Sequence, residues 1–139
     1  MKLVFYADGN AEAGDRLLQK IKDQVSANIV DAYRSLDDFQ QGLLRQRREP
    51  NIGVLMAANA AELQRLITLG KLLTDMRILL VLPDRHKETV AAGHRLRPRY
   101  LGYADSDFED VVAVVKQILK LFPAHETREK DEGRRDERR

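Results

Sequence analysis

The chain has 139 residues, which suits a single domain that can bury an apolar core without metals or disulfides. It contains no cysteine, so disulfides, thiolate zinc sites and cysteine nucleophiles are excluded, and the composition is compatible with a reducing cytoplasm. A net charge of +2, from 24 basic and 22 acidic residues, does not indicate a polyanionic partner. No apolar run is long enough for a signal peptide or a membrane span, so we expect a cytoplasmic protein without membrane contacts.

Apolar runs alternate with segments of helical period along the chain. The predicted strands cover residues 3–6, 27–33, 52–56, 78–82 and 100–103. The predicted helices cover residues 11–25, 36–47, 60–74 and 106–122, and a short irregular helix lies between 85 and 98. The run at 78–82 does not alternate with polar residues. That pattern is typical of a central parallel strand that helices cover on both faces.

Polar residues mark the starts of three predicted helices. Ser35, Asn59 and Ser106 are each followed three residues later by an acid, which is a capping signal. Gly70 is a weak point inside the helix predicted over residues 60–74. Residues 126–139 carry six acids and six Lys or Arg and no apolar residue. We therefore expect one domain over residues 1–123 and a charged tail over 124–139 that is disordered or a frayed helix.

Five strands that alternate with helices predict an α/β fold. The expected architecture is a flavodoxin-like (βα)5 sandwich with a parallel sheet in the order 2-1-3-4-5, because the weak second strand suits an edge. Ligands in such a fold bind beyond the carboxyl ends of the strands, near the first and third. Here this rim comprises the residues after each strand, which are 7–10, 56–59, 82–84 and 103–105.

In element order, element lengths and strand ends, residues 2–122 resemble the receiver domain of bacterial response regulators in two-component systems. The family has two acids after the first strand, where this chain has Ala7 and Asp8. The resemblance puts Met56 at the phosphoacceptor position, or Ala57 if the register slips by one. It puts Leu82 at the hydroxyl position and Tyr103 at the lysine position.

Aspartyl phosphorylation needs a carboxylate nucleophile, a magnesium ion and positive charge near the phosphoryl oxygens. Asp8 alone does not supply this set. The resemblance therefore implies a degenerate pseudo-receiver for signal transduction, with no phosphoacceptor, no catalytic residue, no metal and no cofactor. Such a domain is not an enzyme and acts through a protein partner.

Three alternatives use the rim differently. Small-molecule or nucleotide binding would use Asp8, Asn59 and Asp84. A surviving phosphotransfer function would use Asp8 as the acceptor. A cation would need Asp8, Asp84 and Asp105 to converge, although aspartates at strand ends also serve as turn and cap residues.

A basic segment between Arg85 and Arg99 precedes the last strand. Arg95, Arg97 and Arg99 lie there, with Tyr100 and Tyr103 just beyond. In receivers the corresponding surface is the usual output and dimerisation face, so the resemblance implies docking of an acidic partner or of a second copy. A solvated basic loop is the alternative, and we do not expect nucleic acid because no recognition helix or aromatic platform accompanies the charge.

The last predicted helix is apolar over more than half of its circumference. Its apolar residues are Val111, Val112, Val114, Val115, Ile118, Leu119, Leu121 and Phe122. A stripe this broad predicts an interface in addition to a core-facing side. We therefore expect a homodimer in which Val115 and Leu119 take part, with core packing alone as the alternative.

Overall fold

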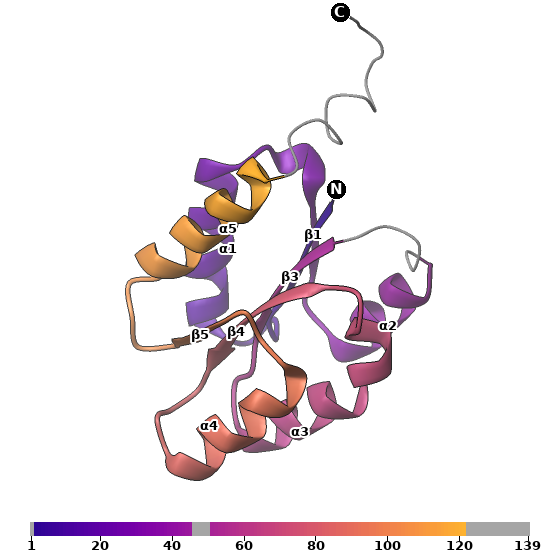
Figure 1. Cartoon of the computed structure of the whole chain (residues 1–139), viewed down its shortest axis with the longest axis vertical. Helices are drawn as coiled ribbons and strands as arrows, with labels where there is room; N and C mark the ends of the chain where they lie inside the picture. The colour runs from indigo at the N-terminus through magenta and orange to yellow at the C-terminus, as the bar shows by residue number, and fades with distance from the viewer. Residues whose placement is uncertain (1, 46–50, 122–139) are drawn as a thin grey trace, which may run out of the picture.

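The computed structural model describes residues 2–45 and 51–121, and these form one five-stranded parallel sheet with helices on both faces (Figure 1). The strands are β1 (Lys2–Tyr6), β2 (Val30–Tyr33), β3 (Asn51–Met56), β4 (Arg77–Leu82) and β5 (Tyr100–Tyr103). They pair in the order β2-β1-β3-β4-β5, and every pair is parallel. The predicted flavodoxin-like (βα)5 fold is confirmed.

Two helices cover one face of the sheet and three cover the other (Figure 1). The helices are α1 (Glu12–Gln24), α2 (Leu36–Arg45), α3 (Ala60–Thr68), α4 (Lys87–Gly93) and α5 (Glu109–Lys120). Helices α1 and α5 share one apolar core with the sheet, while α2, α3 and α4 share a second core on the opposite face. The chain therefore forms three layers with a core on each side of the sheet.

The uninterrupted apolar run in β4 follows from these two cores. Leu79 and Val81 point to the face under α1 and α5, whereas Leu80 and Leu82 point to the face under α2, α3 and α4. All four side chains are fully buried. A strand that is covered on both faces has no position for a polar side chain, which is why the sequence of β4 does not alternate.

Three predicted elements differ in detail from the structure. Residues 27–29 form a 3-10 helix instead of the predicted strand, and the backbone amide of Asn28 donates to Ser26 Oγ at 3.3 Å. Helix α3 ends at Thr68 and a 3-10 helix follows over Gly70–Leu73, so the break coincides with Gly70. Helix α5 begins at Glu109 rather than at Ser106, because Phe108 has a left-handed backbone with φ 65°.

The segment predicted to be irregular, between residues 85 and 98, forms α4 followed by the 3-10 helix His94–Leu96. Gly93 lies at the end of α4, where a Cβ would approach the side chains of Leu80 and Leu82 to 3.2 Å and 3.1 Å. The C-terminal ends predicted for the helices at 47 and 122, the domain boundary at 123 and the tail at 124–139 lie outside the described residues.

Candidate functional site

The residues that the receiver resemblance places at the phosphoacceptor and hydroxyl positions are buried and apolar. Met56 is the last residue of β3, is 2% exposed, and packs in the core under α1 and α5. Leu82 ends β4, is fully buried, and packs in the opposite core. Ala57, the alternative register, is also fully buried. None of these three side chains presents a nucleophile or a hydroxyl group at the rim.

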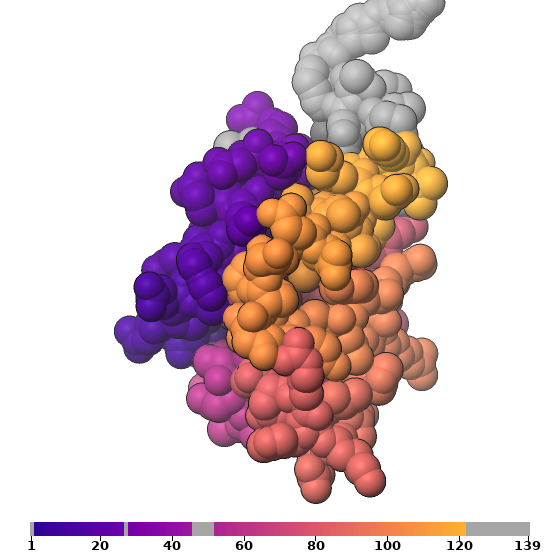
Figure 2. Space-filling view, turned by 90° about the vertical axis from the view of Figure 1, so that its left-hand side faces the viewer, coloured from indigo at the N-terminus to yellow at the C-terminus, as the bar shows by residue number. Residues whose placement is uncertain are grey.

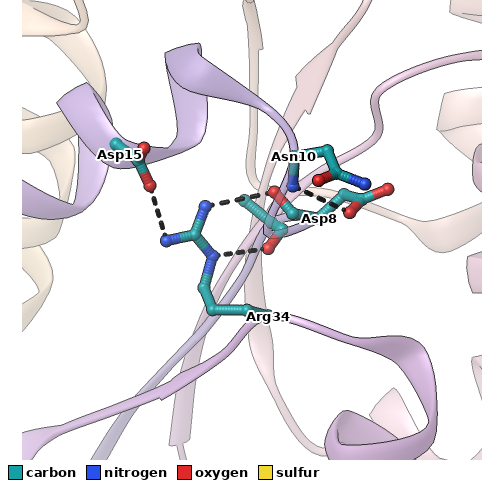
Figure 3. Close-up of polar contacts among 5 residues, drawn as sticks. Asp8, Asn10, Asp15 and Arg34 are labelled. Atoms are coloured by element: carbon teal, nitrogen blue, oxygen red, sulfur yellow. Dashed lines mark hydrogen bonds and ion pairs between the residues drawn. The ribbon is translucent and has the colours of Figure 1, made fainter.

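Asp8 lies in the loop between β1 and α1, and Arg34 holds this loop from the end of β2 (Figure 3). The Arg34 guanidinium donates from Nε to the carbonyl of Ala7 at 2.8 Å and from Nη2 to the carbonyl of Asp8 at 3.1 Å. Its Nη1 lies 2.7 Å from Asp15 Oδ1 in α1. The Asp8 carboxylate itself accepts a local bond, from the backbone amide of Asn10 at 3.1 Å. Arg34 therefore fixes the loop backbone and leaves the Asp8 side chain at the rim.

Glycine at position 14 makes this arrangement possible. A Cβ on Gly14 would lie 2.6 Å from the Cβ of Ala7 and 3.3 Å from Arg34 Nη2. The first distance is shorter than any van der Waals contact, so α1 can approach the end of β1 only with glycine here. Neither Arg34 nor Gly14 belongs to a motif that is visible in the sequence.

A second polar network joins β1 to the start of α3. Glu62 is 9% exposed, and its carboxylate accepts from the Tyr6 hydroxyl at 2.7 Å and from the Ala58 amide at 2.8 Å. The backbone amide of Glu62 in turn donates to Asn59 Oδ1 at 2.9 Å. Asn59 is therefore the N-cap of α3, as predicted. Burial raises the pKa of the Tyr6 hydroxyl, and the hydrogen bond to Glu62 raises it further. The Tyr6 hydroxyl therefore keeps its proton at neutral pH and can donate to Glu62.

A shallow polar hollow of about 240 Å³ opens between these two networks. It is lined by Tyr6, Asp8, Arg34, Ser35, Leu36, Asp37, Glu62 and Arg65. Of the rim residues predicted to bind a small molecule, Asp8 lines this hollow, while Asn59 caps α3. The hollow lies beside β1, where ligands bind in this architecture.

Asp84 and Asp105 take part in local contacts elsewhere along the rim. Asp84 accepts from Thr89 and from the His86 amide, and these bonds lower its pKa. Asp105 pairs with Arg85, and this hydrogen bond lowers the pKa of Asp105. Within residues 2–45 and 51–121, no three His, Asp or Glu side chains are grouped so that they could hold a metal ion. The alternative in which Asp8, Asp84 and Asp105 converge on a cation therefore finds no support in the described part of the chain.

The basic segment is divided between opposite ends of the sheet. Arg85 lies at the rim, where its guanidinium is 4.2 Å from the centroid of the Tyr103 ring. Arg95, Arg97 and Arg99 lie at the other end, because the Arg99 amide donates to the carbonyl of Ile78 near the start of β4 at 2.7 Å. We call residues 95–99 the arginine turn. Its three arginine side chains are exposed and make no ion pair with any described residue.

The two tyrosines of β5 point to opposite faces of the sheet. Tyr100 packs against the core under α1 and α5, whereas Tyr103 packs against the core under α4. A Cβ on Gly102 would lie 3.1 Å from the Val111 side chain, so glycine here lets α5 pack closely on β5. Burial raises the pKa of Tyr100, and the nearby Asp110 carboxylate contributes to the same shift. Tyr100 and Tyr103 are therefore not part of one aromatic surface.

Helix α5 directs most of its apolar residues into the core. Val115 is fully buried, so it cannot contact a second copy while the domain is folded. Leu119 is half-buried and packs against the same core, and Leu121 is 71% exposed. Polar contacts between Lys20 and Glu109 and between Lys116 and Gln24 join α1 to α5. These residues line a hollow of about 240 Å³ between the two helices. Figure 2 faces the side of the molecule where α1 and α5 lie. Dimerisation through α5 stays a prediction.

Among the helices of residues 2–45 and 51–121, none has both the length and the apolar character that crossing a bilayer requires. Comparisons of the chain with models of protein families, with curated proteins and with solved structures found no match.

Proposed function

We propose that the chain is a non-catalytic signalling or regulatory domain of the pseudo-receiver kind, which acts by binding another protein. The observation that carries this proposal is the chemistry of the rim. The positions for a phosphoacceptor and a hydroxyl are buried apolar side chains, Met56 and Leu82. The buried acid Glu62 is bonded to Tyr6 and to a backbone amide of its own chain. These features suit a rim that stabilises the fold rather than one that transfers a phosphoryl group.

The arginine turn supports protein binding. Arg95, Arg97 and Arg99 are exposed and have no acidic partner among the described residues. Exposed arginines form bidentate contacts with carboxylates and are frequent in protein interfaces. An acidic partner would therefore be recognised by charge, and a second copy of the chain is the other occupant that the receiver resemblance implies.

Beryllofluoride with magnesium tests the chemical part of this proposal. It mimics an aspartyl phosphate, so it binds where a carboxylate nucleophile and a magnesium site are both present. We expect no change in the NMR amide signals of Asp8, Ala57 and Tyr103 when it is added to the full-length chain. Magnesium-dependent shifts at Asp8 would contradict the proposal, and loss of those shifts in Asp8→Asn would identify Asp8 as the acceptor.

A second candidate function is small-molecule binding in the hollow beside β1. This hollow contains Asp8, Asp37 and Arg65, and none of these three forms an ion pair with a described residue. A ligand with both positive and negative groups would suit these side chains. NMR titration with free amino acids and with nucleotides tests this candidate. Saturable shifts at Tyr6, Asp8 and Arg65 that disappear in Arg65→Gln would support it, and their absence would exclude these ligands.

A further inference from the structure

The two edge strands of the sheet differ in charge. Strand β2 contains Asp31, whose carboxylate lies 3.5 Å from Lys2 Nζ on the neighbouring strand. Strand β5 has the sequence Tyr100-Leu101-Gly102-Tyr103 and contains no charged residue. In the described part of the chain β5 pairs with β4 alone, so one row of its backbone amides and carbonyls faces no other strand. Unpaired backbone groups at the edge of a sheet can pair with a strand of another chain.

The residues of this edge lie between two helices and are partly exposed. Strand β5 is at the left end of the sheet in Figure 1, between α4 and α5, and Figure 2 faces that side of the molecule. Tyr100, Leu101 and Tyr103 are each only half-buried. Their side chains alternate between the two faces of the sheet, so an added strand would find an apolar neighbour on each face.

The arginine turn leads directly into this edge. Arg99 precedes the first residue of β5, and Arg95 and Arg97 lie in the same turn. Arg97 has a left-handed backbone with φ 53° and ψ 53°, a conformation that is unfavourable for residues other than glycine, asparagine and aspartate. Strained residues cluster at functional sites, so an arginine in this strained, exposed turn points to a use for its charge.

We infer that the free edge of β5 binds an extended acidic segment of another protein, which lies beside β5 as a sixth strand. Main-chain hydrogen bonds would supply affinity, and the arginine turn would select a segment with carboxylates at one end. This inference rests on the proposed function, since it specifies the partner that a protein-binding domain would take and the surface it would use.

A second copy of the chain fits this surface less well than an acidic segment. If two β5 strands paired antiparallel, the start of each would face the end of the other. Asp105, just beyond the end of β5, would then approach Arg99 of the other copy. Asp105 already forms an ion pair with Arg85 of its own chain. It would have to give up this ion pair to contact the arginine turn of a second copy.

The test uses the full-length chain and a short acetylated peptide of alternating Glu and Val, which favours an extended conformation. NMR follows the amide signals of residues 95–103, and hydrogen exchange follows the β5 amides. We expect saturable shifts at these residues and slower exchange of the β5 amides when the peptide is bound. A peptide in which Pro replaces the central Val should bind about tenfold more weakly, because proline has no backbone N–H to donate and interrupts the strand.

Two charge variants control for non-specific attraction. Arg95→Gln/Arg97→Gln/Arg99→Gln removes the positive charge of the arginine turn, and Lys22→Gln/Lys71→Gln/Lys120→Gln removes the same charge from exposed positions elsewhere. We expect the first variant to bind the Glu-Val peptide at least about tenfold more weakly than the wild type. The second variant should retain wild-type affinity apart from the small effect of net charge.

The outcomes separate this inference from the proposed function. In one outcome the signals of the arginine turn shift, the β5 amides are not protected, and the Pro peptide binds equally well. This result would show that the peptide does not add a strand to β5, while binding of another protein would still be supported. No binding of either peptide to residues 95–103 would overturn both. A dimer in light scattering of the chain alone, with protected β5 amides, would show that a second copy occupies the edge and would overturn the acidic segment.

Discussion

The two polar regions of this domain differ in what their charged groups contact. Near the carboxyl ends of β1, β2 and β3, Glu62 and Arg34 are bonded to backbone and side-chain groups of the same chain. In the arginine turn, at the opposite end of the sheet, three arginines have no ion-pair partner among the described residues. The first region holds loops in position, and the second leaves its charge available to another molecule.

This difference predicts opposite effects of substitution. Removing one member of a buried hydrogen-bonded network leaves its partners unsatisfied, which costs about 1–3 kcal/mol for each orphaned group. Removing an exposed, unpaired charge usually changes stability by less than about 0.5 kcal/mol. Mutations near β1 should therefore act on stability, and mutations in the arginine turn should act on binding.

Glu62→Ala should give the largest loss of stability. It removes the acceptor of the Tyr6 hydroxyl and of the Ala58 amide, so we expect the free energy of unfolding to fall by about 2–3 kcal/mol. Urea denaturation with an unchanged m-value is the measurement. Glu62→Gln is the matched control, because the amide can still accept from Ala58 and donate to Tyr6. A loss below about 0.5 kcal/mol in Glu62→Ala would contradict a structural role for the network.

Arg34→Ala should cost about 2 kcal/mol, because it breaks two hydrogen bonds to the carbonyls of Ala7 and Asp8 together with the ion pair to Asp15. Asp15→Asn separates these contributions, since it weakens only the partly exposed ion pair and should cost less than about 1 kcal/mol. Both values come from denaturant titrations. Equal losses in the two variants would mean that the ion pair, and not the bonds to the loop backbone, holds Arg34.

Alkaline pH should weaken the domain through Tyr6. The pKa of Tyr6 is raised in the folded state by burial and by the bond to Glu62. Its contribution to the free energy of unfolding is therefore fully present below the ordinary tyrosine pKa of about 10. The contribution is lost as the pH rises above that value, because only the unfolded chain then ionises at this position. The loss should reach about 1.4 kcal/mol roughly one pH unit higher. Tyr6→Phe should show a flatter decline in stability over the same pH range, and an unchanged decline would contradict this assignment.

Arg95→Gln/Arg97→Gln/Arg99→Gln should have the smallest effect on folding. All three side chains are exposed, so we expect a change in unfolding free energy within about 0.5 kcal/mol. The same variant should lose its affinity for acidic peptides, as measured by titration. A large loss of stability would show that these arginines have a structural role that the contacts among the described residues do not include.

The fold could be predicted because it depends on patterns that are local in sequence. The uninterrupted apolar run of β4 indicated a strand buried on both faces. Gly70 indicated a weak point in the helix predicted over residues 60–74, and α3 ends at Thr68, just before it. Asn59 and Glu62 indicated the start of that helix. Each of these signals involves residues within a few positions of each other, so no knowledge of the tertiary arrangement was needed.

The rim networks could not be predicted because their partners are distant in sequence. Arg34 binds carbonyl groups of Ala7 and Asp8, and any residue supplies a carbonyl, so the sequence contains no sign of the pairing. Glu62 was recognised as a capping residue, but its bond to the Tyr6 hydroxyl depends on how β1 and α3 pack.

The direction of individual side chains could be predicted only in part. Tyr100 and Tyr103 are three residues apart on a strand, and side chains on a strand alternate between faces, so their spacing already places them on opposite faces of the sheet. Val115 is a different case. Its place in the broad apolar stripe of α5 was clear, but the structure was needed to show that it faces the core.

The most direct test of the account compares both regions in one experiment. A ¹⁵N-labelled sample of the full-length chain is titrated with the acidic Glu-Val peptide, and the amide signals of the arginine turn, β5 and the rim are followed together. The account predicts saturable shifts at residues 95–103 and unchanged signals at Tyr6, Asp8 and Glu62. Shifts at Tyr6, Asp8 and Glu62 with an unchanged arginine turn would contradict it, because the rim would then be the binding surface.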